Sequence, residues 1–188
     1  MLYNSRLALH DGGAPSKLPT HLMPSDPTFR RITTDDDVRF CATLMCGSEP
    51  WLTLHRDYAG AERLFCDPGK ESWLVEMDGA PAGFIVLEMQ GAFVGYIKSI
   101  CIAPEFRGSG LGTRTLHFAE QRIFSRFPNV FLCVSSFNTR ARKLYERLGY
   151  ELVGELRDYV ITGASELLMR KTRGPLVSGA EASDSPVR

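Results

Sequence analysis

Three glycines at alternate positions are the most informative feature of the sequence. A β-type run that ends at Ile102 breaks at Pro104, and Gly108, Gly110 and Gly112 then precede an amphipathic helical pattern. Glycines allow successive backbone amides to turn toward one ligand, and a helix N-terminus adds partial positive charge. The segment therefore predicts a binding site for a phosphate or pyrophosphate group, whereas a merely tight strand-to-helix connection would need only one glycine.

The spacing of these glycines excludes two common nucleotide sites. A Walker A loop requires a lysine after its last glycine, but Gly112 is followed by Thr113 and Arg114. A dinucleotide-binding fingerprint requires G-x-G-x-x-G within a strand–helix–strand unit, whereas this segment has G-x-G-x-G and follows an antiparallel strand pattern. Neither a nucleoside triphosphate site nor a Rossmann-type site is expected.

Two segments resemble the signatures of one enzyme superfamily. Residues 107–112, RGSGLG, fit the pattern R/Q-x-x-G-x-G of the Gcn5-related N-acetyltransferase (GNAT) superfamily. Residues 138–150, NTRARKLYERLGY, resemble its second motif, N-x-x-A-x-x-x-Y-x-x-x-G-[FY]. The order of the expected helices and strands also agrees, from about residue 29 to residue 171. The resemblance implies the GNAT fold and acetyl-coenzyme A as cosubstrate. The four histidines show no ligand-like spacing, so no metal is expected.

The resemblance also implies which residues hold the coenzyme. The pantetheine arm would pair with the strand before the signature, the amides of residues 107–113 would hold the pyrophosphate, Asn138 would contact the pantetheine, and Arg142 would contact the adenosine phosphate. Ser109 stands where the family often has a basic residue. The expected coenzyme contacts are Ile100, Cys101, Ile102, Arg107, Gly108, Ser109, Gly110, Leu111, Gly112, Thr113, Asn138 and Arg142.

Acyl transfer from a thioester to an amine requires an unprotonated amine, a stabilised oxyanion and a proton for the departing thiolate. By resemblance, a backbone amide near Ile102 would stabilise the oxyanion. Tyr145 matches the family tyrosine that protonates the thiolate, although a core tyrosine would show the same spacing. Some eukaryotic N-terminal acetyltransferases have a tyrosine where this chain has Tyr96, together with a histidine where it has Cys133. The general base is predicted to be Tyr96, directly or through a bound water, or else Glu88 on the neighbouring strand.

In this superfamily the acceptor is selected by the segment between the first two helices and by the last hairpin. Glu49 and Trp51 would contact a cationic amine, or Trp51 would instead close the edge of the core. Tyr159 matches a hairpin tyrosine of peptide N-terminal acetyltransferases. The predicted reaction is direct attack of a primary amine (a protein N-terminus, a lysine or a small amine) on acetyl-coenzyme A in a ternary complex. The alternatives are transfer of a longer acyl group and a non-catalytic acetyl-coenzyme A-binding sensor or regulatory module.

The elements that must position these residues follow from hydrophobic periodicity. Thr34, followed by three aspartates, is a strong helix start, and Gly149 is a typical helix end. Helices are expected from residue 35, over 54–65, from 111 to 123 and over 141–148. Strands are expected over 72–77, 83–89, 94–102, 130–134, 150–159 and 166–170, of which the first three form an antiparallel meander. The class is mixed α/β, a single domain with a central, mostly antiparallel sheet flanked by helices.

Composition restricts the class of protein further. The chain has 188 residues with 22 Lys plus Arg and 22 Asp plus Glu, so its zero net charge argues against a general nucleic-acid or membrane-surface binder. The sequence has neither an apolar run of about 20 residues nor a secretory signal, which favours a cytoplasmic protein. Five cysteines without a C-x-x-C motif indicate neither a disulfide framework nor a zinc site. The proline- and glycine-rich ends predict flexible segments at 1–28 and 172–188 around a domain at 29–171. The sequence leaves open whether the protein is a monomer or a dimer.

Overall fold

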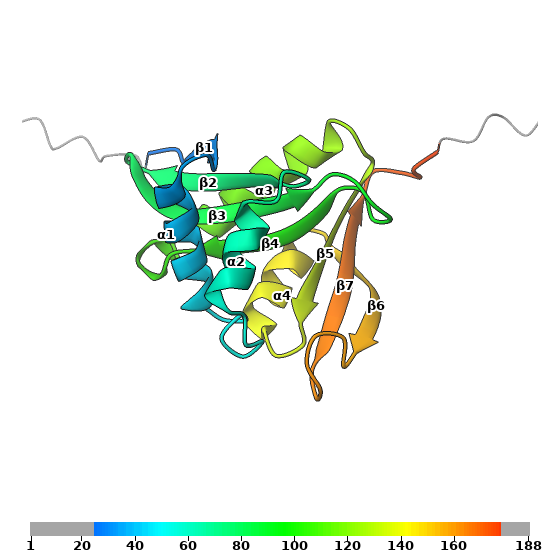
Figure 1. The fold of residues 1–188 in the computed structure, drawn as a ribbon. Helices are drawn as coiled ribbons and strands as arrows, with labels where there is room; N and C mark the ends of the chain where they lie inside the picture. The colour runs from blue at the N-terminus through cyan, green and yellow to red at the C-terminus, as the bar shows by residue number, and fades with distance from the viewer. Residues whose placement is uncertain (1–24, 178–188) are drawn as a thin grey trace, which may run out of the picture.

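The computed structural model describes residues 25–177, so the expected terminal segments lie mostly outside the described residues. Seven strands form one sheet in the order β1-β2-β3-β4-β5-β7-β6 (Figure 1). The strands are β1 (Thr28–Arg31), β2 (Glu71–Met77), β3 (Ala80–Glu88), β4 (Tyr96–Ile102), β5 (Asn129–Ser135), β6 (Glu151–Arg157) and β7 (Ser165–Thr172). The helices are α1 (Asp35–Cys46), α2 (Tyr58–Phe65), the short 3-10 helix η1 (Pro104–Phe106), α3 (Leu111–Phe124) and α4 (Thr139–Arg147). The mixed α/β class and the antiparallel meander of β2, β3 and β4 are confirmed.

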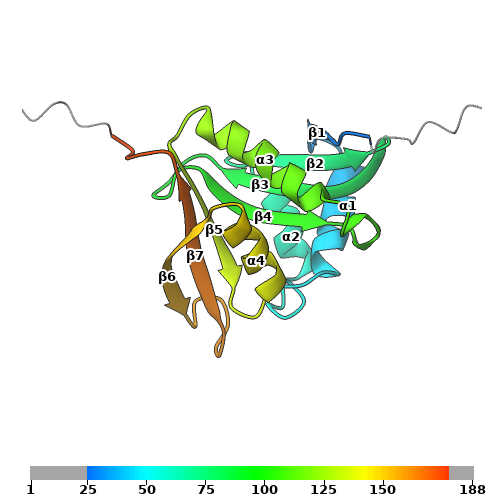
Figure 2. The same ribbon diagram turned by 180° about the vertical axis from the view of Figure 1, so that it is seen from behind.

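Helices cover both faces of the sheet, α1 and α2 on one and α3 and α4 on the other (Figures 1 and 2). Met45 of α1 and Phe65 of α2 pack with Phe84 of β3 in one core cluster. Leu116 of α3 and Tyr145 of α4 belong to a second cluster with residues of β3, β4, β5 and β7. The buried positions recur at helical spacing, so the amphipathic faces read from the sequence are the faces that pack.

The sheet opens between its two central strands. β4 and β5 are the parallel pair, and they pair at two positions, Tyr96 with Phe131 and Ile97 with Leu132. Toward their C-terminal ends they diverge, while β5 continues to pair with β7 along its whole length. The opening leaves backbone groups of β4 without a partner strand, and such groups need another hydrogen-bonding partner. The glycine loop, residues 107–112, follows β4 at this point.

The start of α1 agrees with the expected capping. Thr34 Oγ1 accepts from the amide of Asp37 at 3.2 Å, and the Asp37 carboxylate accepts from the amide of Thr34 at 3.2 Å. Arg30 of β1 donates two hydrogen bonds of 2.7 Å to the same carboxylate. One aspartate therefore caps the helix and ties the edge strand to it.

Several boundaries differ from the sequence-based expectation. The second helix begins at Tyr58 rather than at residue 54, because Asp57 caps it by accepting from the Gly60 amide at 2.8 Å and residues 50–55 form turns. β1 was not expected, since its four residues have no clear alternation, and it places Thr28 inside the sheet. At the other end β7 extends to Thr172. The sheet therefore runs from Thr28 to Thr172.

Candidate functional site

Two pockets meet at the opening between β4 and β5. The glycine-loop pocket lies beside α3 and α4. The hairpin pocket lies between the α1–α2 segment, residues 96–100 of β4, residues 132–135 of β5, and the β6–β7 hairpin. Both are lined by Glu49, Ile100, Asn138, Ala141 and Tyr145. A ligand extending through both pockets would therefore pass Tyr145.

The glycine loop has the geometry expected of an anion site. Gly108 and Gly110 have φ values of +84° and +81°, in the left-handed region that favours glycine. A Cβ at either position would meet no atom within 4 Å, so the loop faces open space. Gly110 is the N-cap of α3 and supplies no side-chain cap, which leaves the first amides of the helix available to an anion. These features fit the pyrophosphate of a coenzyme.

Not every expected contact lies in the glycine-loop pocket. Its lining includes Ile100, Cys101, Ile102, Arg107, Gly108, Gly110, Gly112, Thr113 and Asn138 from the expected set. Ser109 instead donates its hydroxyl hydrogen to the Phe106 carbonyl at 2.7 Å, and the Leu111 side chain is buried in the core. For these two residues only the backbone remains available.

The basic side chains of α4 lie on different sides of the helix. Arg142 does not line either pocket, because its Nε donates to Glu146 Oε1 at 2.8 Å along the helix. Arg140, Lys143 and Arg147 line the glycine-loop pocket instead. Residues three or four apart share a helix face, so position 142 faces away from the face that carries 140, 143 and 147. The structure therefore brings Arg140, Lys143 and Arg147 to the glycine-loop pocket and does not bring Arg142 there.

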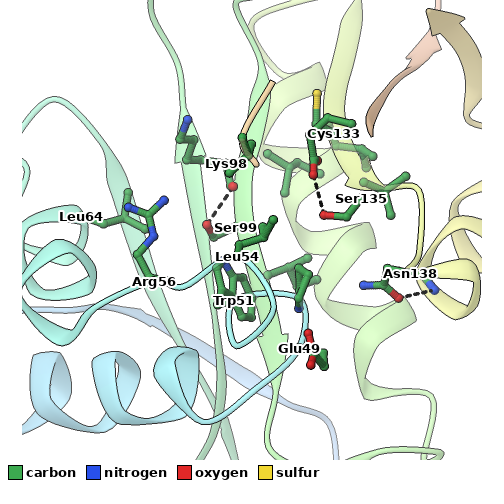
Figure 3. A pocket seen from close by; sticks show the side chains of 18 of the residues that line it. Glu49, Trp51, Leu54, Arg56, Leu64, Lys98, Ser99, Cys133, Ser135 and Asn138 are labelled. Atoms are coloured by element: carbon green, nitrogen blue, oxygen red, sulfur yellow. Dashed lines mark hydrogen bonds between the residues drawn. The ribbon is translucent and has the colours of Figure 1, made fainter. Parts of the chain in front are cut away.

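Tyr145 lies where the two pockets meet, almost fully buried, with its ring edge-to-face against Tyr150. Burial raises the pKa of Tyr145 to about 12, so its hydroxyl stays protonated at neutral pH and can donate a proton. Asn138 caps α4, since its Oδ1 accepts from the Ala141 amide at 3.2 Å (Figure 3). Its amide nitrogen makes no hydrogen bond within residues 25–177 and is available to a ligand.

The two expected general bases are placed differently. Tyr96 lines the hairpin pocket, but burial, the neighbouring Cys133 and the charge of Glu166 raise its pKa well above the ordinary value. It therefore stays protonated at neutral pH, which favours its holding a water over its acting directly as the base. Glu88 pairs with Tyr96 across the β3–β4 ladder, yet it lines neither pocket. The structure does not bring the Glu88 carboxylate to the site.

The expected acceptor contacts all line the hairpin pocket. Glu49 and Trp51 come from the α1–α2 segment, opposite the strands that carry Ser99 and Ser135 (Figure 3). The Glu49 carboxylate accepts from the amide and the hydroxyl of Thr53 at 3.3 and 3.1 Å. Trp51 also packs on Phe84 of the core, with ring centroids 5.9 Å apart, so it closes the edge of the core while it lines the pocket. Tyr159 lies at the rim and is 68% exposed.

Sequence reasoning missed a buried polar pair in the hairpin pocket. Ser135 of β5 and Glu166 of β7 are opposite each other in the antiparallel ladder. The Ser135 hydroxyl donates to Glu166 Oε1 at 2.5 Å, and burial raises the pKa of the Glu166 carboxyl. The one signal in the sequence was an acidic residue directly before the apolar run at 167–169, which by itself does not reveal what lies opposite.

The described residues offer neither a metal-binding cluster nor a membrane-spanning helix. No group of three or more His, Cys, Asp or Glu side chains between residues 25 and 177 is placed to hold a metal ion. In the same part of the chain, no helix combines the length and the apolar character needed to cross a membrane.

Known proteins resemble this chain in sequence and fold. Residues 33–150 match the acetyltransferase (GNAT) family. N-acetylaspartate synthetase of Danio rerio is 30% identical over 129 residues, covering 65% of this chain, and the chain spans 42% of that protein's length. N-alpha-acetyltransferase RimI of Mycobacterium tuberculosis is 28% identical over 157 residues, 80% of this chain and 96% of the relative. The crystal structure of spermidine N-acetyltransferase from Vibrio cholerae in complex with CoA and spermine has a TM-score of 0.62 at 21% identity, covering 78% of this chain and 95% of that one.

Proposed function

Since the chain belongs to the acetyltransferase (GNAT) family, whose members are acyl-coenzyme A-dependent N-acetyltransferases, we propose that it transfers an acetyl group from acetyl-coenzyme A to a primary amine. The observation that carries this proposal is the position of Tyr145. Tyr145, whose hydroxyl stays protonated, lines both the pocket suited to a pyrophosphate and the pocket that contains the Glu166 carboxylate. Thioester and amine would meet beside it.

The glycine-loop pocket is the proposed site of acetyl-coenzyme A. The open backbone of residues 100–102 would pair with the pantetheine arm, and the amides of the glycine loop would hold the pyrophosphate. Arg140, Lys143 and Arg147 would add positive charge around the phosphates. The cosubstrate supplies an activated acetyl thioester, and the residues of the chain hold it in place and manage protons.

Tyr145 is the proposed general acid. A departing thiolate takes the proton of its hydroxyl, while a backbone amide near Ile102 stabilises the oxyanion that forms first. Direct attack by the amine is favoured over a covalent acyl-enzyme. The thiols nearest the site, Cys101 and Cys133, both have a pKa raised by burial and are therefore poor nucleophiles.

The acceptor is proposed to be a protein N-terminus, a lysine side chain or a small amine. The names of relatives refer to two of these three kinds of acceptor. N-alpha-acetyltransferase RimI is named for acetylation of protein N-termini, and N-acetylaspartate synthetase and spermidine N-acetyltransferase are named for small amines. The mouth of the hairpin pocket carries the half-buried Trp51 and the exposed Tyr159, which suits a cationic amine through contacts with aromatic faces.

The proposal is tested by thiol release from acetyl-coenzyme A over a panel of amines. The panel contains peptides with different N-termini, a peptide with an internal lysine, spermidine and aspartate. We expect release that depends on both acetyl-coenzyme A and one class of amine. Tight binding of acetyl-coenzyme A in calorimetry, with no amine-dependent release across the panel, would overturn the enzyme proposal in favour of a coenzyme-binding module.

A further inference from the structure

Resting on the proposed acetyl transfer, we propose that Glu166 binds the ammonium group of the acceptor and takes its proton. Glu166 lines the hairpin pocket from β7, and Tyr145 lines the same pocket from α4. The two sides of the pocket would then carry the two proton-transfer groups of the reaction, a base beside the amine and an acid beside the sulfur.

Glu166 differs from the other buried carboxylates of residues 25–177. Asp37, Glu120 and Glu166 are 6%, 7% and 7% exposed. Asp37 is paired with Arg30 at 2.7 Å, and Glu120 with Lys171 at 2.7 Å. Glu166 has no lysine or arginine within ion-pair distance in the described part of the chain, and its hydrogen-bond partner is the neutral hydroxyl of Ser135.

An unpaired buried carboxylate is costly, because the charge loses its water without gaining a counter-ion. Unpaired buried charges are therefore often found in functional sites, where a bound ligand supplies the missing counter-charge. The pocket that contains Glu166 is also lined by Glu49, Trp51 and Tyr159. A primary amine enters such a pocket as an ammonium ion, so it would bring the counter-ion that the chain does not provide.

Glu166 is the carboxylate of the cluster that it forms with Tyr96 and Cys133, on the side of the pocket made by the strands. Tyr96 of β4 and Cys133 of β5 face it, and burial raises the pKa of each, so both stay protonated. The ammonium group of Lys98 on β4 also lies near Cys133, and the phenol of Tyr159 on the hairpin lies near Tyr96. Although burial raises the pKa of the Glu166 carboxyl as well, carboxyls start several units below thiols and phenols. Glu166 therefore ionises before Tyr96 and Cys133.

The proposed step balances as follows. One proton moves from the ammonium nitrogen to the Glu166 carboxylate and leaves a neutral amine. The amine lone pair forms the C–N bond at the thioester carbonyl, the C–S bond breaks, and its electron pair leaves with sulfur, which takes the Tyr145 proton. The nitrogen returns its remaining extra proton to Tyr145, and Glu166 releases its proton to solvent. The products are the amide, the free thiol and one proton.

Ser135 is the positioning residue of this pair. Its hydroxyl donates to Oε1 of Glu166, which fixes the carboxylate plane and leaves Oε2 free for the ammonium group. Hydroxyl and carboxylate come from adjacent strands that pair along the full length of β5. The carboxylate is thus held by rigid sheet rather than by a loop, as a proton acceptor requires.

The test compares Glu166→Gln with the wild-type chain on two acceptors. One is the panel amine with the fastest thiol release, which is an ammonium ion at neutral pH, and the other is hydroxylamine, which is uncharged there. We expect Glu166→Gln to lower kcat/KM for the ammonium acceptor by about 100-fold at pH 7, the lower range for a general base. The loss should shrink as pH rises and should be minor with hydroxylamine.

Two further variants complete the test. Ser135→Ala should show a smaller loss with the same dependence on acceptor charge, and Glu155→Gln, on the exposed strand of the same hairpin, should match the wild type. Equal losses on both acceptors at every pH would mean that Glu166 only supports the fold, and an unchanged rate would also overturn the inference. If the wild-type chain acetylates no amine at all, the proposed function fails instead.

Discussion

The guanidinium of Arg107 joins the glycine loop to Ser48 in the segment between α1 and α2. Its Nη2 donates to Ser48 Oγ at 3.3 Å, and its Nε donates to the Ile102 carbonyl at 2.8 Å. Ser48 is buried and directly precedes Glu49, which lines both pockets. One side chain therefore links the loop proposed to hold the pyrophosphate with the segment proposed to contact the amine.

Removing that link should weaken the binding of both substrates. Arg107→Ala is expected to raise KM for acetyl-coenzyme A and for the amine by about fivefold each, which corresponds to about 1 kcal/mol of lost hydrogen bonding. Arg107→Lys should restore little, because one ammonium group cannot replace a planar fork with two partners. Arg39→Ala, which removes an exposed arginine of α1, is the control in steady-state kinetics. A rise in KM for acetyl-coenzyme A alone would contradict the proposal that Arg107 links the two binding sites.

Gly110→Ala tests the glycine loop against a matched turn. Gly110 and Gly79 have φ values of +81° and +78°, and a Cβ at either would meet no protein atom within 4 Å. Both substitutions should therefore lower the free energy of unfolding by a similar amount, about 1–2 kcal/mol. Only Gly110→Ala should raise KM for acetyl-coenzyme A, by about tenfold, since its Cβ would occupy the proposed pyrophosphate site. Equal KM values in the two variants would argue against that site.

The basic face of α4 can be tested one residue at a time. Arg140→Ala and Lys143→Ala should each weaken acetyl-coenzyme A binding by about fivefold in calorimetry, and the loss should decrease as salt rises. Arg142→Ala is the internal control, since its guanidinium is paired with Glu146 on the other side of the helix. If Arg142→Ala weakened binding most, the face of α4 that carries Arg140 and Lys143 would not be the face that contacts the coenzyme.

Tyr145→Phe removes the proposed general acid and leaves the ring in place. We expect kcat to fall by about 100-fold, with little change in acetyl-coenzyme A affinity. Because the pKa of Tyr145 is raised to about 12, the hydroxyl stays protonated over the usual assay range, so ionisation of Tyr145 should cause no loss of wild-type activity up to about pH 10. Tyr150→Phe is the matched control, a buried neighbouring tyrosine that lines neither pocket. Equal rates for Tyr145→Phe and wild type would remove Tyr145 from the mechanism.

Asp37 should make stability depend on pH. Arg30, with the amides of Thr33 and Thr34, holds the pKa of the Asp37 carboxyl well below its usual range. A carboxyl whose pKa is lower in the folded than in the unfolded state stabilises the fold at pH values above its unfolded-state pKa. This stabilisation is lost progressively as pH falls below about 4. Asp37→Asn should cost about 2 kcal/mol of unfolding free energy at pH 7. That cost should diminish in urea titrations at progressively lower pH.

The neighbouring residue gives the control for this prediction. Asp36 pairs with Arg39, but both side chains are largely exposed, at 86% and 67%. Exposed pairs contribute little, so Asp36→Asn should change the unfolding free energy by less than about 0.5 kcal/mol. A similar cost for both substitutions, or a cost of Asp37→Asn that stays constant down to pH 3, would contradict the assignment.

The parts of the site that the sequence determined are local ones. The glycine loop, Asn138 at the start of α4, and Tyr145 seven residues later lie within short segments whose backbone geometry follows from residue type and spacing. The capping box at Thr34 was readable for the same reason. Within such segments the partner of each group is only a few residues away, so the pattern contains the interaction.

Tertiary structure alone decided which charges reach the site. Ser135 and Glu166 are 31 residues apart, and the register of β5 against β7 makes them neighbours. A shift by one residue would turn each side chain to the other face of the sheet. The exclusion of Glu88 and the choice of Arg140 over Arg142 likewise depend on strand placement and on helix phase. Which charged side chains of a strand or helix point into a pocket depends on which face of that element is packed against the rest of the protein. The sequence alone does not determine this, because the packing involves residues far apart in the chain.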